Sequence, residues 1–184
     1  MQKEFVIGIS GASGACYARR LLEMLCRDAK VHIIVSDVAG EIAAHEGVSF
    51  EGFTAMYHDI DKMGASIASG SHYVDGMVVI PCSVKTLAAI ASGYADNLIT
   101  RTADVCIKEH RPCILVTREM PLSKIHLRNM LAAADAGATI MPACPGFYHN
   151  PRTIDDLVDM VVARVLDHLG MEHTLVKRWG GYDA

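Results

Sequence analysis

The chain has 184 residues, of which 51% are hydrophobic and 21% are charged, so it has the composition of a folded protein with one ordinary core. Its 21 aspartates and glutamates outnumber its 17 lysines and arginines, and the resulting net charge of −4 excludes a broad basic surface for nucleic acid. No apolar run approaches the roughly 18 residues of a membrane span and the N-terminus lacks the pattern of a signal peptide, so we expect a cytoplasmic protein with no membrane partner.

The first half of the chain reads as strands that alternate with helices. A β-rich run over Glu4–Ser10 leads through a Gly-Ala-Ser-Gly turn into apolar residues at helical spacing over Ala15–Leu25. A second unit follows, with an apolar strand at Val31–Val35 and a helix at Val38–His45 that Ser36 can cap. Two such units in succession predict parallel pairing of their strands.

Three further strands are expected in the rest of the chain. The third strand, Gly76–Pro81, precedes a helix at Val84–Ala91, and the fourth, Cys113–Thr117, precedes a helix at Lys124–Ala136. A short fifth strand is predicted at Ala138–Met141. Strands of nearly continuous apolar character are typical of a parallel sheet covered on both faces, so the predicted fold is a three-layer α/β/α, Rossmann-like sandwich with a mainly parallel sheet.

The end of the chain is predicted to hold one more helix and a tail. Asn150–Leu169 reads as an amphipathic helix with Thr153 as its N-cap. No linker, repeat or low-complexity tract divides residues 1–184, which we expect to form a single domain. The tail, from about residue 170 to 184, has little periodicity and is expected to pack on a neighbouring subunit.

Several loops with polar or charged residues follow the predicted strands. Ligands of open parallel sheets bind beyond the carboxyl ends of the strands. Ser10–Ser13, Ser36, Pro81–Thr86, Arg118 and Glu119 are therefore predicted to converge on one edge of the sheet. A charged pair directly after a core strand does not contribute to packing of the core, so a functional role is favoured for Arg118 and Glu119.

Two of these loops have the composition of an anion site. Gly8–Ala15 (GISGASGA) places small residues where a strand becomes a helix, so that backbone N–H groups and hydroxyls can approach a phosphate. It is neither the dinucleotide fingerprint nor a P-loop, and a tight structural turn is the alternative. Ser83 and Thr86 either cap the following helix or hold a second part of the same anion.

Other polar residues have two interpretations each. Arg101 and Lys108 fall seven residues apart on one face of a predicted helix with Asp104 between them, and ion pairing within the helix is the alternative to ligand binding. Tyr148 offers a hydroxyl on a loop or is a core aromatic, and Arg164 projects from a helix that is otherwise apolar on that side.

The cysteines and histidines predict neither a disulfide framework nor a metal site. The six cysteines form no C-x-x-C pair, and the nine histidines show no H-x-x-x-H or H-E-x-x-H spacing. Cys82 lies beside a predicted site loop, but no base is close to it in the sequence, and we interpret it as a buried thiol.

Six sequence blocks follow one another in a recognisable order: GISGASGA, IASGS, MVVIPCSVKTLAAIASGYADNLITRTADVCIKE, REMPLSKIHLRNM, PGFYHNPRTIDDLVD and a closing RW. Together they resemble the UbiX/Pad family of flavin prenyltransferases over nearly the whole chain. Each block is moderately specific, and their shared order and spacing carry the resemblance. Residues 47–63 and the placement of the cysteines match the family less well.

The resemblance implies an activity. Members of this family are Rossmann-like flavoproteins that form dodecamers and transfer a dimethylallyl group from dimethylallyl phosphate to N5 and C6 of reduced FMN, without a metal. The product, prenylated FMN, serves a UbiD-type decarboxylase. One alternative is an FMN-binding accessory subunit of a hydroxyarylic acid decarboxylase without prenyl transfer, and another is a flavin-dependent cysteine decarboxylase. Lys108, Tyr148 and Arg164 argue against the accessory subunit, because a protein that only carries flavin needs no residues to hold a prenyl phosphate. The PCSVKT and REMPLS blocks argue against the cysteine decarboxylase.

The resemblance also implies site residues. Those expected to bind FMN are Gly11, Ala12, Ser13, Ser36, Ser83, Val84, Lys85, Thr86 and Arg118. Those expected to bind the prenyl phosphate, some from an adjacent subunit, are Arg101, Lys108, Tyr148 and Arg164. Cations such as Lys108 would stabilise the leaving phosphate, which makes Lys108 a catalytic candidate. Ser13, Glu46 and Glu119 are, with the departing phosphate, the candidates for the proton transfers of ring closure, and the sequence does not rank them.

Overall fold

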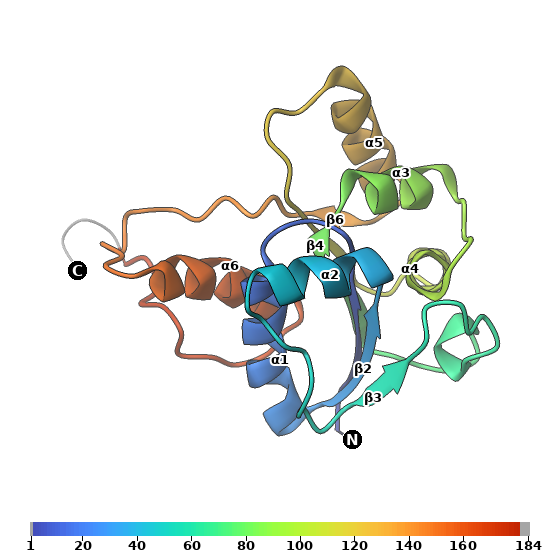
Figure 1. Ribbon diagram of the computed structural model, residues 1–184, viewed down its shortest axis with the longest axis horizontal. Helices are drawn as coiled ribbons and strands as arrows, with labels where there is room; N and C mark the ends of the chain where they lie inside the picture. Colours follow the sequence, from blue (N-terminus) through green and yellow to red (C-terminus); the bar gives the residue numbers. More distant parts are fainter. Residues whose placement is uncertain (1, 181–184) are drawn as a thin grey trace.

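The structure of the chain is a computed structural model that describes residues 2–180 (Figure 1). Its centre is a six-stranded sheet in the order β3-β2-β1-β4-β5-β6, and every neighbouring pair is parallel. The strands are β1 (Glu4–Ile9), β2 (Lys30–Val35), β3 (Met56–His58), β4 (Gly76–Cys82), β5 (Cys113–Thr117) and β6 (Thr139–Ile140). The helices are α1 (Ala15–Asp28), α2 (Asp37–His45), the short 3₁₀ helix η1 (Ser66–Ala68), α3 (Val84–Ser92), α4 (Leu98–Lys108), α5 (Lys124–Asp135) and α6 (Ile154–His168).

The sheet has a hydrophobic core on each face because its strands alternate the direction of apolar side chains. Phe5 and Ile7 of β1 pack on one face in a cluster with residues of α1, α2 and α6. Val6 packs on the other face in a cluster with residues of η1, α3 and α4. Helices on both faces of a parallel sheet confirm the predicted three-layer α/β/α fold (Figure 1).

The strand order places a crevice at the carboxyl ends of β1 and β4. The chain runs from β1 to β2 and β3 on one side and then crosses to β4, β5 and β6 on the other, which makes β1 and β4 the point where the winding reverses. Two hydrogen bonds join the loops there, from Ser83 N to Ser10 Oγ at 2.8 Å and from Ser10 Oγ to the Pro81 carbonyl at 3.0 Å. Ligands of such sheets bind at this position.

The predicted elements agree with the structure except for the edge strand β3 and the short helix η1, which the sequence analysis did not predict. The strand at Cys113–Thr117 and the N-cap Thr153, whose hydroxyl accepts from Asp156 N at 3.1 Å, are confirmed. The predicted five strands are one too few, because β3 was missed. It has three residues, two of them exposed, so neither apolar alternation nor length distinguishes it from a loop.

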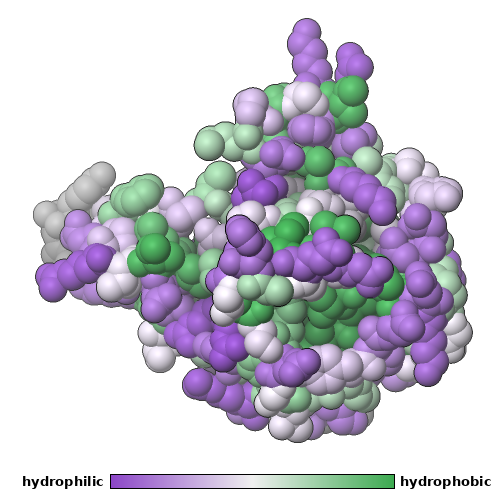
Figure 2. All heavy atoms as spheres, viewed as in Figure 1, coloured by the Kyte–Doolittle hydropathy of each residue, from purple (hydrophilic) through white to green (hydrophobic). Residues whose placement is uncertain are grey.

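Helix α5 contributes little to either core. Its only buried residue is Ala133, whereas Ile125, Leu127 and Leu131 are 66%, 51% and 63% exposed. In Figure 1 it stands beside α3 on a part of the molecule that protrudes from the sheet, and Figure 2 shows apolar side chains among polar ones on the surface of that part. Within residues 2–180 no helix has the length and apolarity needed to cross a bilayer.

Candidate functional site

A cavity of about 410 Å³ lies at the carboxyl ends of the strands, where three helices begin. Ser36, Ser83 and Asn97 are the N-caps of α2, α3 and α4, and all three line this cavity. Each N-cap side chain accepts a hydrogen bond from the backbone of its own helix, at 3.2, 3.3 and 3.1 Å. Because the N-terminal end of a helix carries partial positive charge, the cavity has a field that favours an anion such as a phosphate.

The cavity contains many of the residues expected to bind FMN. Gly11, Ser36, Ser83, Val84, Lys85 and Thr86 line it. Sequence reasoning did not single out Asn97, although its spacing to Thr100 is that of a capping box, which the structure contains. Asp37, Asp61 and Asp96 also line the cavity, so Lys85 and the helix N-termini, rather than a surplus of basic side chains, would hold an anion there.

Gly11 stands where only a residue without a side chain fits. A Cβ atom at this position would lie 2.7 Å from Cγ1 of Val38 in α2. The turn after β1 therefore lies so close to the first turn of α2 that a side chain at Gly11 would force Val38 to move.

The N-terminus of α1 is occupied by a carboxylate from the end of α2. Glu46 accepts hydrogen bonds from the N–H groups of Gly14, at 3.0 Å, and Ala15, at 2.8 Å, and the Ser13 hydroxyl also bonds to it. Partial burial would raise the pKa of Glu46, but the Ser13 and backbone hydrogen bonds, with the nearby charge of Arg118, lower it overall. The N–H groups of Gly14 and Ala15 were expected to face a phosphate, but they already bind Glu46. The helix N-termini that face the cavity are those of α2, α3 and α4.

Arg118 brings the loop after β5 to the same place. Its Nε donates a hydrogen bond of 3.1 Å to the backbone carbonyl of Ser13. The Arg118 side chain is otherwise exposed, and the neighbouring Glu119 is half-buried with its carboxylate on Met120 N at 3.0 Å. The loops after β1, β2, β4 and β5 therefore converge at one rim, as the parallel sheet predicted.

A second cavity, of about 320 Å³, lies between α6 and the loop that follows β6. Arg164 lines it together with apolar residues that include Met141 and Met160. Tyr148 does not line this cavity itself, but its hydroxyl contacts Sδ of the lining residue Met160 at 3.8 Å. The loop after β6, which lines this cavity, lies next to the rim, because Ala143 N donates a hydrogen bond to the Thr117 carbonyl at 2.9 Å.

Arg101 and Lys108 do not line either cavity of this chain. Arg101 Nη1 pairs with Asp104 at 2.7 Å, which is the ion pair within the helix that the sequence allowed. Lys108 is exposed, pairs with Glu109 and ends the 11-residue α4, about 15 Å along its axis from the cap at Asn97. The chain thus places Arg164 at the second cavity and Tyr148 against one of its lining residues, Met160, whereas Arg101 and Lys108 line neither cavity.

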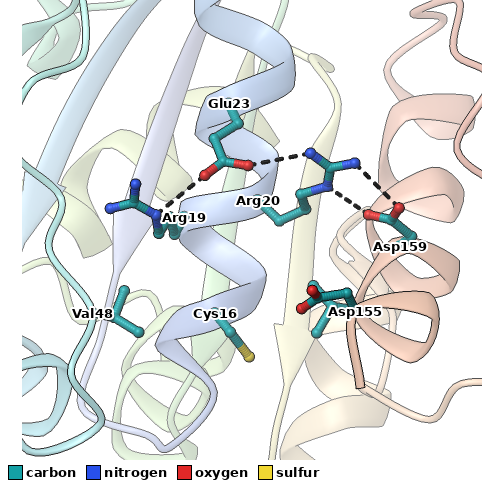
Figure 3. Close-up of a pocket in the computed structure, with 8 residues that line it drawn as sticks. Cys16, Arg19, Arg20, Glu23, Val48, Asp155 and Asp159 are labelled. Atoms are coloured by element: carbon teal, nitrogen blue, oxygen red, sulfur yellow. Dashed lines mark hydrogen bonds and ion pairs between the residues drawn. The ribbon is translucent and has the colours of Figure 1, made fainter. Parts of the chain in front are cut away.

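A third cavity, of about 350 Å³, lies between α1 and α6, and both arginines that line it are paired with carboxylates (Figure 3). Arg20 bonds to Asp159 at 2.6 Å and to Glu23 at 3.2 Å, and Glu23 also pairs with Arg19 at 3.1 Å. Because these cations are already paired, the cavity reads as a structural contact between the two helices.

The structure confirms that Cys82 is a buried thiol. Its side chain lies wholly inside the protein, and burial raises its pKa to about 12. A thiol that does not ionise near neutral pH is not a nucleophile, although its neighbour Ser83 lines the site.

Comparison with known proteins relates this geometry to one family. A family model described as Flavoprotein matches residues 1–166. The flavin prenyltransferase UbiX of Methanocaldococcus jannaschii is 44% identical over 181 residues, which cover 96% of this chain and 98% of that protein. The UbiX protein of Salmonella typhimurium is 45% identical over 188 residues, with 97% and 99% covered.

Solved structures agree with the sequence comparison. A crystal structure of AnUbiX (PadA1) in complex with FMN and dimethylallyl pyrophosphate is 42% identical, covers 99% of this chain with all of its own, and has a TM-score of 0.93. A dodecameric FMN-dependent UbiX-like decarboxylase from Escherichia coli O157:H7 is 44% identical, covers 97% of this chain and all of its own, and has a TM-score of 0.92. The FMN-dependent cysteine decarboxylase TvaF, at 17% identity and a TM-score of 0.67, shares the fold alone. The chain therefore belongs to the UbiX family of flavin prenyltransferases.

Proposed function

We propose that this chain transfers the dimethylallyl group of dimethylallyl phosphate to N5 and C6 of reduced FMN and releases phosphate and prenylated FMN. The observation that carries the proposal is the meeting of three helix N-termini at one cavity, beside a rim that Arg118 and Glu46 complete. Reduced flavin supplies an electron-rich ring that an allylic carbon can alkylate. The known relatives and the FMN in the AnUbiX structure support this assignment.

The first three loops hold the FMN phosphate in this proposal. Ser36 and Ser83 present hydroxyls and the open ends of α2 and α3, and Lys85 adds the cation. Gly11 lines the cavity, where a larger residue would collide with Val38 of α2, and Ala12 is the buried residue that follows it. Val84 and Thr86 form the first turn of α3. Ser13 and Arg118, which are joined by a hydrogen bond, bind the flavin ring at the rim.

The prenyl phosphate occupies the cavity beside Tyr148 and Arg164. Apolar walls suit a five-carbon isoprenoid, and Arg164 suits its phosphate. Arg101 and Lys108 join this site from a second copy of the chain, since neither faces it within one chain. The leaving phosphate gains negative charge as the allylic C–O bond breaks, so these cations stabilise the transition state more than the ground state.

Glu46 is the strongest candidate for the proton acceptor of ring closure. Its lowered pKa keeps it ionised at neutral pH, and Ser13 connects it by a hydrogen bond to the flavin side of the rim. Glu119 lies after the same strand as Arg118, with its carboxylate turned to the backbone of Met120, and is the second candidate.

The exposed face of α5 and the tail are surfaces for self-assembly. Leu127 and Leu131 lie one turn apart on α5 and are exposed within residues 2–180, Ile125 is exposed on another side of the helix, and the related E. coli protein is dodecameric. Residues 170–180 also pack on their own chain, with Arg178 on Asp167 at 2.8 Å and Trp179 against Tyr148. The expected contact of the tail with a neighbour is part of this proposal, and its last residues, 181–184, lie outside the described residues.

The chain works as one domain in the cytoplasm. It passes prenylated FMN to a UbiD-type decarboxylase, because this product is a modified cofactor that has no use unless another enzyme binds it.

The experiment is to mix the purified protein with reduced FMN and dimethylallyl phosphate without oxygen and to measure the mass of the flavin. A mass increase of one C5 prenyl unit, absent when the protein is omitted, is expected. Parallel reactions with dimethylallyl pyrophosphate, the ligand in the AnUbiX structure, identify the donor. Unchanged flavin with either donor, while FMN is bound, would identify an accessory flavin carrier instead.

A further inference from the structure

A cluster of imidazole and carboxylate groups lies at the other end of the sheet from the flavin site. Glu4 Oε1 is 2.8 Å from Nε2 of His32 and 2.7 Å from Nε2 of His72. The three ligand atoms all lie within 4.8 Å of one another. Glu4 opens β1, whereas the flavin loops follow its end, so about six residues or 20 Å of strand separate the two sites.

The fold holds these three side chains in place from separate elements. Glu4 and His32 project from β1 and β2 on the same face of the sheet, where His32 is 2% exposed. His72 comes from the loop before β4, whose backbone Arg111 fixes with hydrogen bonds to the carbonyls of His72, at 2.8 Å, and Gly70, at 2.7 Å. Glu4 is held by its own backbone N–H, which donates to Asp75 at 2.8 Å.

We propose that Glu4, His32 and His72 form a binding site for a divalent transition metal, of which Zn²⁺ suits the ligands best. Two imidazole nitrogens and one carboxylate oxygen are a common zinc ligand set, with bonds of about 2.0–2.2 Å. Neighbouring ligand atoms then stand about 3.3 Å apart, so the present contacts open by about half an ångström when the ion replaces the shared protons.

A third histidine, His58, supports the ligand His32 in the way metal sites require. Nδ1 of His32 is 2.8 Å from Nε2 of His58, and the two rings stack at 5.0 Å. With Nε2 of His32 on the metal, the neutral ring carries its proton on Nδ1 and donates it to Nε2 of His58. A hydrogen bond on the far nitrogen orients a metal-bound imidazole and strengthens it as a ligand.

The fourth coordination position is open to solvent. Glu4, His32 and His72 line a cavity of about 690 Å³ that is separate from the three cavities described above. Three protein ligands and one accessible position leave room for water or a small anion on the metal. The sequence predicted no metal site because His32 and His72 follow Glu4 by 28 and 68 residues, which is beyond the span of any short motif.

The test is a titration of the full chain, without an affinity tag and dialysed against a chelator, with Co²⁺ followed by Zn²⁺. One Co²⁺ per chain is expected, with the visible absorption of a tetrahedral site, no thiolate charge-transfer band, and displacement by Zn²⁺. Zn²⁺ should also raise the melting temperature, because it binds the folded state and ties β1, β2 and the loop before β4 together.

Variants distinguish this site from other histidines and from thiols. Glu4→Gln and His72→Gln should each weaken Co²⁺ binding by at least about tenfold, and their unchanged melting temperatures without metal would show that they fold. His110→Gln, at an exposed position outside the cluster, and Cys144→Ser, at the exposed thiol, should bind Co²⁺ as the unmodified chain does. Failure to bind Co²⁺, or binding unaffected by Glu4→Gln and His72→Gln, would overturn the proposal. Neither result bears on prenyl transfer.

Discussion

Arg118 donates a hydrogen bond of 3.1 Å to the backbone carbonyl of Ser13, across 105 residues of sequence. This contact joins the loops after the first and fifth strands of the parallel sheet, and Glu46 extends it by binding the turn that contains Ser13. The flavin rim is thus a set of loops held by one another before any ligand arrives, which lowers the entropy cost of binding.

Replacing Arg118 should weaken flavin binding. Arg118→Met removes a charged donor from the rim, and the dissociation constant for FMN should rise about 10- to 100-fold, as expected for loss of a hydrogen bond from a charged group. Flavin fluorescence measures this. Arg27→Met, at the far end of α1, is the matched control and should bind FMN normally. Equal affinities in the two variants would show that Arg118 does not touch the flavin.

Glu46 should make a contribution to stability that depends on pH. Its folded pKa lies below its ordinary value of 4.5, so the contribution is complete above that value and is lost as the pH falls through the folded pKa. Glu46→Gln should therefore lower the free energy of unfolding by about 1–2 kcal/mol at neutral pH and by much less in acid. Urea unfolding across this range measures the difference.

The control for Glu46 is on the same helix. Glu41→Gln, at an exposed position of α2, should change the free energy of unfolding little at any pH. A constant difference between Glu46→Gln and the unmodified chain across the pH range would contradict an ionised Glu46 at the α1 N-terminus.

Lys108 should matter for turnover and not for flavin binding. Lys108→Ala should lower kcat by about 100- to 1,000-fold, the effect of removing one group that stabilises transition-state charge, while the dissociation constant for FMN stays the same. Lys30→Ala, exposed at the start of β2 and at the other end of the sheet from the flavin loops, is the control. Unimpaired turnover of Lys108→Ala would reject the role proposed for this residue.

A mixing experiment tests whether the prenyl site is shared between copies. Lys108→Ala and Arg164→Ala should each be inactive alone. Because the proposed site takes Lys108 from one copy and Arg164 from another, dissociating and reassembling the two variants together should restore on the order of a quarter of the activity by random pairing. No recovery in properly assembled mixtures would place both residues of a working site in one chain.

The apolar face of α5 should be needed for assembly. The double variant Leu127→Lys and Leu131→Lys puts two charges on this face, and light scattering should report a smaller assembly with lower turnover. Met63→Lys, at another exposed apolar position, should assemble normally. An unchanged mass for the double variant would show that copies meet elsewhere.

Local sequence signals predicted the elements, and the rule for parallel sheets predicted where the loops meet. The apolar run at Cys113–Thr117 and the Thr153 cap needed only neighbouring residues, and the Arg118 loop reached Ser13 because all strands end at one edge. Edge strand β3 was missed because its pairing with β2, rather than its own residues, makes it a strand.

Contacts between distant side chains lay beyond sequence reasoning from the residues alone. No local pattern indicates that Glu46 caps a helix that begins 31 residues earlier, and its place in the site came from the family resemblance. The same holds for Glu4, His32 and His72, whose meeting depends on strand register and on the path of one loop.

A crystal structure of the chain with FMN and dimethylallyl phosphate tests the central claim most directly. It should place the FMN phosphate within hydrogen-bonding distance of the loops of Ser36 and Ser83, with the flavin ring beside Arg118 and the prenyl phosphate beside Arg164. FMN bound in the cavity between α1 and α6, or anywhere remote from Arg118 and Tyr148, would contradict it.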